Sequence, residues 1–169
     1  MDNIKLYEID PAYIDYLSPH APHLFHNAKT TQNNKRKYIG VVLTINDYQY
    51  FAPLSSFKEK HKTMKESIDF LKVKKYCVIN LNNMLPVPFN LCNYININNE
   101  KNPKYKELLL AEYRYIKSIQ DKIRKNAKAV YTIKLKNDNS TLANRCNDFK
   151  LLEKLCSEYE NRIIPNHSI

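Results

Sequence analysis

Residues 38–54 carry the strongest structural signal in the sequence. Positions 38–45 read YIGVVLTI, a nearly continuous run rich in β-branched residues, and positions 48–54 read YQYFAPL and resume the extended pattern. Asn46 and Asp47 separate the two runs and are residue types that favour tight turns. The pattern therefore predicts a β-hairpin, which requires an antiparallel sheet around it.

Three further segments favour strands. Residues 4–9 alternate between apolar and polar side chains, and residues 76–81 are apolar and partly β-branched. A third segment, residues 84–87, contains Pro86 and is followed by Pro88, which places it at an edge of the sheet or at its exit. Together with the hairpin, these segments predict a small antiparallel, barrel-like sheet.

Helical signals surround these strands. Asp10 and Pro11 form a cap and first turn for a short helix, and Asn102 and Pro103 do the same for a long helix whose apolar residues continue to Ala127. A last helix is predicted near residues 149–163 from apolar steps of three and four. The fold class is thus α+β, a sheet with surrounding helices that include one long and one C-terminal helix. No repeat or linker divides the chain, so residues 1–169 are predicted to form a single domain.

The net charge of +10 is unevenly distributed along the chain. Residues 28–75 contain 11 basic and 4 acidic side chains, and residues 104–136 contain 10 basic and 3 acidic ones. Two basic blocks of this kind indicate a surface for a polyanion, and nucleic acid is the natural partner. The alternative is that these lysines only keep the protein soluble.

Several other classes of function are excluded or disfavoured. A single glycine, Gly40, rules out the usual glycine-rich nucleotide-binding loops. The four cysteines form no C-x-x-C pair, and Pro19 and Pro22 interrupt the histidines at 20, 23 and 26, so no metal and no cofactor is expected. Neither a secretory signal nor a membrane span is apparent, which predicts a cytoplasmic protein without a membrane partner.

The exit of the hairpin is the best candidate site. Residues 53–61 read PLSSFKEKH and bring two hydroxyls, two lysines and a histidine together where a strand gives way to a loop. An RNA 2′-hydroxyl can attack the neighbouring phosphate without a metal if a base removes its proton and cations stabilise the phosphorane. On the residues alone the signal is weak, because two serines before charged residues also form a helix cap.

The same segment resembles the signature of the ToxN/AbiQ toxins, the protein partners of type III RNA antitoxins. The hairpin leads into Ala52-Pro53-Leu54-Ser55-Ser56-Phe57-Lys58, and an A-P-L-[ST]-S-x-K core is fairly specific. Other stretches agree in order and spacing over nearly the whole chain: Lys5-Leu6-Tyr7, Ile79-Asn80-Leu81, Tyr105-Lys106, Asp121-Lys122-Ile123 and Cys146-Asn147-Asp148-Phe149.

The resemblance implies a fold similar to the MazF and Kid toxins and a sequence-preferring, metal-independent endoribonuclease. Cleavage would leave a 2′,3′-cyclic phosphate and a 5′-hydroxyl. By position, Ser55 and Ser56 fall on the family's hydroxyl pair at the scissile phosphate, and Lys58 falls on its catalytic lysine. An ammonium there can stabilise the charge of the phosphorane.

The resemblance also implies functional residues in the loop before the second strand, where this sequence departs from the pattern. Thr31 stands where relatives have tyrosine. The lysine equivalent is Lys35 if one residue is inserted and Arg36 if none is. His61 is an alternative general base because its ordinary pKa suits proton transfer near neutrality.

RNA contacts are expected from basic residues in the loop, the hairpin exit and one flank of the long helix. The alternative interpretation of the basic flank of the long helix is a solvent-exposed surface with no role in binding. The expected RNA-binding residues are Arg36, Lys37, Lys60, His61, Lys65, Arg114, Lys117 and Lys125.

The implied partner is a small repeat-derived RNA antitoxin, usually a pseudoknot, that the toxin cuts from its own precursor. Toxin and RNA would alternate in a closed ring, and binding would depend on salt. Cellular or phage RNA would be the substrate. Phage defence by abortive infection and plasmid maintenance both remain open roles.

Two other functions compete with this interpretation. A non-catalytic basic RNA-binding module or regulator would bind RNA without cutting it. A protein-binding toxin of similar barrel fold would poison an enzyme and would not need a lysine at the hairpin exit.

Overall fold

The structure is a computed structural model that describes residues 2–22, 24, 36–136 and 139–163. Within these residues a seven-stranded sheet has the order β4-β5-β3-β2-β1-β7, with β6 paired to β3. Every pairing is antiparallel. The strands are β1 (Lys5–Ile9), β2 (Tyr38–Ile45), β3 (Tyr48–Ser56), β4 (Phe70–Val73), β5 (Cys77–Asn80), β6 (Leu85–Pro86) and β7 (Cys92–Tyr94).

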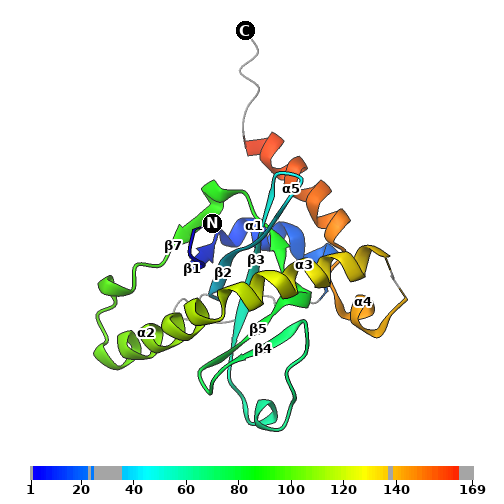
Figure 1. Ribbon diagram of the computed structural model, residues 1–169. Coiled ribbons are helices and arrows are strands. Elements are labelled where there is room, and N and C mark those ends of the chain that lie inside the picture. Colours follow the sequence, from blue (N-terminus) through cyan, green and yellow to red (C-terminus); the bar gives the residue numbers. More distant parts are fainter. Residues whose placement is uncertain (1, 23, 25–35, 137–138, 164–169) are drawn as a thin grey trace.

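Helices surround this sheet, which confirms the predicted α+β class (Figure 1). They are α1 (Pro11–Leu17), α2 (Pro103–Ser118), α3 (Gln120–Lys136), α4 (Thr141–Arg145) and α5 (Phe149–Ile163). Short 3₁₀ turns connect several elements, among them η2 (Glu59–Lys62) after β3. None of the described helices is long and apolar enough to cross a membrane.

The predicted hairpin is confirmed as β2 and β3. Asn46 and Asp47 have φ values of 47° and 67°, so both occupy the left-handed region that a two-residue type I′ turn requires. The register then shifts between Gly40 and Leu43, which marks a β-bulge. Gly40 lies against the ring of Phe51, and a side chain at position 40 would overlap that ring.

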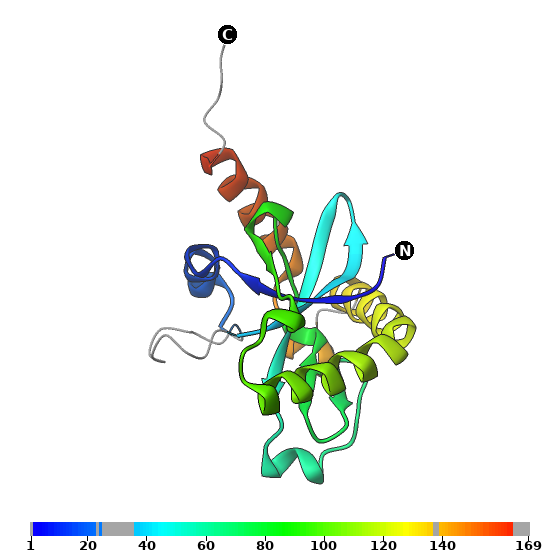
Figure 2. The same ribbon diagram turned by 90° about the vertical axis from the view of Figure 1, so that its left-hand side faces the viewer.

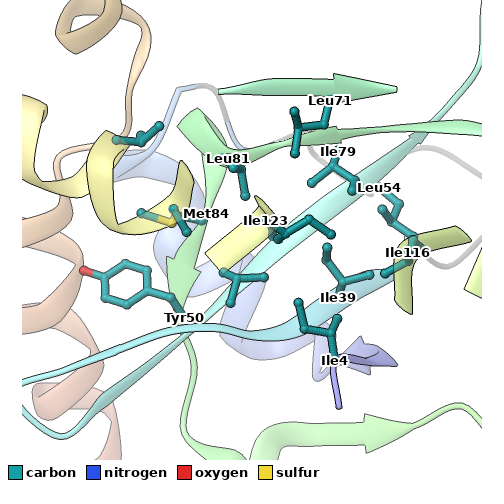
Figure 3. Packing of buried hydrophobic residues seen from close by; sticks show 14 of the residues in the cluster. Ile4, Ile39, Tyr50, Leu54, Leu71, Ile79, Leu81, Met84, Ile116 and Ile123 are labelled. Atoms are coloured by element: carbon teal, nitrogen blue, oxygen red, sulfur yellow. The ribbon is translucent and has the colours of Figure 1, made fainter. Parts of the chain in front are cut away.

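Each face of the sheet buries its own apolar cluster, because successive residues of a strand point to opposite faces. Tyr50, Ala52 and Leu54 of β3 belong to one cluster, which α2 and α3 cover (Figure 3). Phe51 of β3 belongs to the other cluster, with α1 and most of the apolar face of α5. Figure 2 shows α1 on one side of the strands and α2 and α3 on the other.

The predicted long helix is two helices, α2 and α3, which meet at Ile119. Ile119 has φ −112° and ψ 13°, outside the helical region, and the Ser118 hydroxyl donates to the Tyr115 carbonyl at 2.7 Å. A side chain that binds the main chain in this way competes with the regular helical hydrogen bonds, and a β-branched residue follows it. The segment predicted as one long helix is therefore divided in two, and α3 continues beyond Ala127 to Lys136.

A buried carboxylate ties α5 to the sheet and to α3. Glu153 is buried, and its Oε1 accepts from the Tyr50 hydroxyl at 2.9 Å and from the Tyr131 hydroxyl at 2.7 Å. Lys150 lies 2.9 Å from the other carboxylate oxygen. The cation and two hydroxyls compensate for burying this charge.

Candidate active site

Ser55 and Ser56 are the last two residues of β3, at the end of the strand farthest from the hairpin turn. Ser55 is in register with Val78 of β5, and Ser56 with Cys77. Ser55 is half-buried and Ser56 is exposed. Because neighbouring residues of a strand point to opposite faces, the two hydroxyls lie on opposite sides of the sheet.

Ser55 is positioned by Asn80, a residue that the sequence analysis did not include in the site. The Asn80 side-chain amide donates to the Ser55 hydroxyl oxygen at 3.1 Å. This contact leaves the serine proton available to donate elsewhere, for example to an anion. A polar residue at the end of the apolar strand 76–79 was the signal that could have identified it.

Lys58 follows β3, and His61 fixes its main chain twice. The Lys58 backbone N–H donates to Nδ1 of His61 at 2.9 Å, and the His61 N–H donates to the Lys58 carbonyl at 2.9 Å. The Lys58 residue is nevertheless exposed. The loop therefore holds the backbone of this lysine and leaves its ammonium to solvent, an arrangement that suits a preorganised cation.

His61 is 5% exposed and lies between two aromatic rings. Its ring centre is 5.5 Å from that of Phe57 and 5.7 Å from that of Phe70. Burial lowers its pKa, and Lys60, Lys58 and Lys72 lower it further by repulsion. We expected His61 among the RNA contacts, but so buried a ring has little surface to offer. Its contacts are those of a group that positions Lys58.

The connection between β3 and β4 is anchored at two places. Asp69 is 3% exposed at its side chain and accepts two bonds from Arg145 of α4, at 2.6 and 2.8 Å. Burial alone would raise the pKa of Asp69, but these bonds and one from Ser67 outweigh burial and lower it. Glu66 accepts from the Lys72 backbone N–H at 2.8 Å and pairs with Lys122 of α3 at 3.3 Å. The loop that carries Lys58 is therefore tied to two helices.

Arg36 and Lys37 directly precede β2, beside the end of β3. The Leu54 N–H donates to the Lys37 carbonyl at 2.9 Å, which extends the strand pairing beyond Tyr38 and Pro53. One further step of this register places Arg36 across from Ser55. Thr31 and Lys35, the other two expected members of the site, lie outside the described residues.

Lys37 is oriented toward α2. Its ammonium lies 4.2 Å from the ring centre of Tyr105. Burial lowers the pKa of Lys37, whereas the buried carboxylate Glu112 raises it. Burial likewise raises the pKa of Glu112, and Lys37 opposes that rise. We expected Lys37 to bind RNA, but its charge already compensates a buried carboxylate.

The remaining expected RNA-binding cations are exposed and divide into two groups. Lys60 and Lys65 lie on the β3–β4 connection, near Lys58 in the chain. Arg114 and Lys117 of α2 and Lys125 of α3 lie on the helices that cover the face of the sheet opposite Ser55. The structure thus does not gather all of these residues around Ser55.

Among the described residues, no group of three or more His, Cys, Asp or Glu side chains could hold a metal ion. His20 is exposed, and His23 and His26 lie outside the described residues. Burial raises the pKa of the Cys92 thiol to about 12 and of the Cys156 thiol to about 11, so neither is a ready thiolate. A hollow of about 120 Å³ between Pro88 and Glu160 lies near the start of β3, at the other end of the strand from Ser55, and presents a carboxylate, which would repel RNA.

Comparison with known protein families gives one match over most of the chain. The family described as toxin ToxN of the type III toxin–antitoxin system matches residues 5–157. The matched span includes the hairpin, its exit and all but the end of α5.

Curated relatives are similar over nearly their whole length. Endoribonuclease ToxN of Bacillus thuringiensis subsp. kurstaki is 32% identical over 170 residues, which cover 95% of this chain and 87% of that protein. Endoribonuclease ToxN of Pectobacterium atrosepticum is 30% identical, covering 89% and 91%. Endoribonuclease AbiQ of Lactococcus lactis subsp. lactis is 31% identical, covering 94% and 91%.

Solved structures share the fold. A type III toxin that is selectively inhibited by a non-coding RNA pseudoknot superposes with a TM-score of 0.81 and 30% identity, covering 95% of this chain and all of that one. AbiQ, a lactococcal anti-phage endoribonuclease of the type III toxin–antitoxin system, superposes with a TM-score of 0.83 and 28% identity, covering 95% and 99%.

Proposed function

The chain belongs to the ToxN family of toxins from type III toxin–antitoxin systems, and from that membership we propose that it is an endoribonuclease whose active site is the exit of the β2–β3 hairpin. The relatives named endoribonuclease cover the segment 53–61 together with the rest of the chain. The observation that carries the proposal is the placement of Lys58. His61 holds its main chain at two points, while the lysine itself is exposed beside two serines.

We propose that cleavage proceeds by attack of the RNA 2′-hydroxyl on the adjacent phosphate. A base takes the 2′-hydroxyl proton, the new oxygen–phosphorus bond closes a 2′,3′-cyclic phosphate, and the 5′-oxygen leaves and is protonated to a 5′-hydroxyl. No metal or other cofactor enters this scheme. The crowded phosphorane carries two negative charges, so cations and hydrogen-bond donors aimed at it lower the barrier.

Lys58 supplies the cation in this scheme, and Ser55 supplies a hydroxyl donor. Ser56, whose hydroxyl lies on the other side of the sheet at the end of the strand, belongs to the proposed site on the family resemblance. Ser55 can donate because Asn80 already satisfies its oxygen. Arg36, across from Ser55 in the extended register, adds a charge that pairs well with phosphate. Thr31 and Lys35 complete the proposed site on the family resemblance, with one of them the candidate for base.

The regulator that we propose is a repeat-derived RNA antitoxin folded as a pseudoknot. It binds over the active site, is cut from its precursor by the toxin and closes a ring of alternating toxin and RNA. The relative that a pseudoknot inhibits supports this inference, and so do the two basic blocks of the sequence. Substrates would be cellular or phage RNA in the cytoplasm, and abortive infection is one role that fits the anti-phage relative.

A non-catalytic RNA-binding module is the main alternative. Such a module would account for the net charge of +10. It would not account for Lys58, whose backbone N–H and carbonyl are both hydrogen-bonded to His61. Cleavage measurements separate the two functions.

The test compares the wild-type protein with Lys58→Ala and with Lys62→Ala, which removes an exposed lysine of the same connection that was not expected to contact RNA. Each protein is incubated with a defined mixed-sequence RNA in excess EDTA, and the fragments are quantified and their ends mapped. Lys58→Ala should lose at least about 100-fold in rate, as expected for removal of one transition-state charge contact. Lys62→Ala should retain most of its activity. RNA that is bound but left intact by the wild type would overturn the proposal and favour the binding module.

A further inference from the structure

An open hollow of about 360 Å³ lies between the β4–β5 turn and the C-terminal half of α2. Two cations, two tyrosines, an alanine and a serine line it: Lys74, Tyr76, Ala111, Arg114, Tyr115 and Ser118. Its size falls within the range of about 300–1,000 Å³ that is typical of small-ligand sites. Positive charge beside aromatic faces is the combination with which proteins hold single-stranded nucleic acid.

The backbone of Lys74 is strained where this hollow begins. Its φ is 50°, in the left-handed region that glycine and asparagine adopt readily and lysine adopts only at a cost. The turn is otherwise regular, since Val73 pairs with Cys77 and the Tyr76 N–H donates to the Val73 carbonyl at 3.0 Å. The lysine at this position brings its ammonium to 5.5 Å from the ring centre of Tyr115.

The hollow lies next to the end of β3. Ser56 is in register with Cys77, whose neighbour Tyr76 lines the hollow. Adjacent strands are separated by roughly 4.8 Å, so this wall of the hollow is close to the Ser56 backbone. Leu54 and Ser56 face the side of the sheet that α2 covers, which is also the side of the hollow. An RNA strand that crosses the end of β3 would therefore reach it.

We propose that this hollow is a nucleotide subsite for the RNA strand beside the cleaved bond. The base lies against Tyr76, because the Lys74 ammonium already lies over the ring of Tyr115, and a phosphate lies between Lys74 and Arg114. The recognised chemistry is a single-stranded nucleotide, because only an unpaired base exposes its face to a tyrosine. This proposal rests on the proposed endoribonuclease function and adds Lys74, Tyr76 and Tyr115 to Arg114, the one lining residue that the sequence predicted to contact RNA.

The neighbouring residue Lys75 provides a matched control. It is exposed, lies in the same turn and carries the same charge, but it does not line the hollow. Lys74→Asn and Lys75→Asn therefore remove one charge each from adjacent positions. Asparagine also tolerates the left-handed backbone, so Lys74→Asn should melt at or above the wild-type temperature. A merely structural role of the Lys74 contact with Tyr115 predicts instead a lower melting temperature.

The experiment measures KM and kcat for cleavage of a defined single-stranded mixed-sequence RNA by each variant. Lys74→Asn should raise KM about tenfold, the size expected for one lost hydrogen bond to a charged group, and leave kcat within a factor of about two. Combining it with Arg114→Gln should raise KM further, while Lys75→Asn should match the wild type. If the wild type cuts RNA and the two lysine variants behave alike, the subsite is refuted and the endoribonuclease stands. If the wild type does not cut RNA, both proposals fail.

Discussion

Lys58 and His61 divide positioning and chemistry between two residues three positions apart. The imidazole is nearly inaccessible and accepts one main-chain hydrogen bond, while the backbone N–H of His61 donates another, so His61 is a positioning residue. Lys58 keeps an exposed side chain on a fixed backbone. Fixing the backbone in advance reduces what the enzyme has to reorganise when charge develops on the phosphate.

The protonation of His61 should make this arrangement sensitive to acid. A protonated imidazole cannot accept the Lys58 N–H, and its ordinary pKa is about 6.5. Because burial and nearby lysines lower that pKa in the folded protein, the unfolded chain binds the proton more readily. The contribution of His61 to the free energy of unfolding should therefore be constant above about pH 6.5 and decrease as the pH falls from there toward the lowered pKa.

His61→Asn tests this directly, because asparagine retains an acceptor in a similar place and does not titrate. At pH 7.5 the variant should cut RNA at a rate within about threefold of the wild type, because it keeps an acceptor for the Lys58 N–H. A less favourable geometry could cost only part of a hydrogen bond that is worth about 1 kcal/mol in total. Between pH 6.5 and 5 the wild type should lose activity more steeply than the variant. Parallel pH profiles of cleavage would show that His61 does not govern the acid limb. His61→Leu, which has no acceptor, should be impaired at every pH.

The elements with strong local signals were predictable, and those that depend on tertiary contacts were not. The hairpin, α1 and α5 follow from β-branched runs, a turn pair, a capped proline and regular apolar steps. Strands β4 and β7 were missed because they have four and three residues and contain Lys72 and Asn93. Such short strands exist only because a neighbour supplies the hydrogen bonds. The break at Ile119 was missed for the same reason, since the apolar pattern continues through it.

Helix α5 should depend on its buried carboxylate. Glu153→Ala leaves the hydroxyls of Tyr50 and Tyr131 without their acceptor and removes the partner of Lys150. The free energy of unfolding should fall by about 3 kcal/mol or more, as is typical when one member of a buried charged network is removed. Glu158→Ala is the control on the same helix, because its pair with Lys154 spans 3.9 Å between exposed side chains. It should cost less than about 1 kcal/mol. Equal losses in urea unfolding would contradict this view of Glu153.

At the scale of the whole molecule, the sheet separates Ser55 from several of the exposed basic residues. Ser55 and Asn80 lie on one face, while α2 and α3 bring Arg114 and Lys117 to the other side. The sequence predicted that residues 28–75 and 104–136 are basic, because charge counts need no coordinates. It could not show that Lys37 lies near Glu112 or that Asn80 meets Ser55, because these contacts join residues that are distant in the chain.

The most direct test of the central claim replaces the 2′-hydroxyl that is proposed to attack. The cleavage position is mapped in a short RNA, and the same RNA is made with a single 2′-deoxynucleotide on the 5′ side of that bond. The wild-type protein should cut the unmodified RNA to 2′,3′-cyclic phosphate and 5′-hydroxyl ends in EDTA, and it should leave the modified bond intact while still binding the strand. Cleavage of the modified bond at the normal rate would contradict the account, because water rather than the RNA itself would then be the nucleophile.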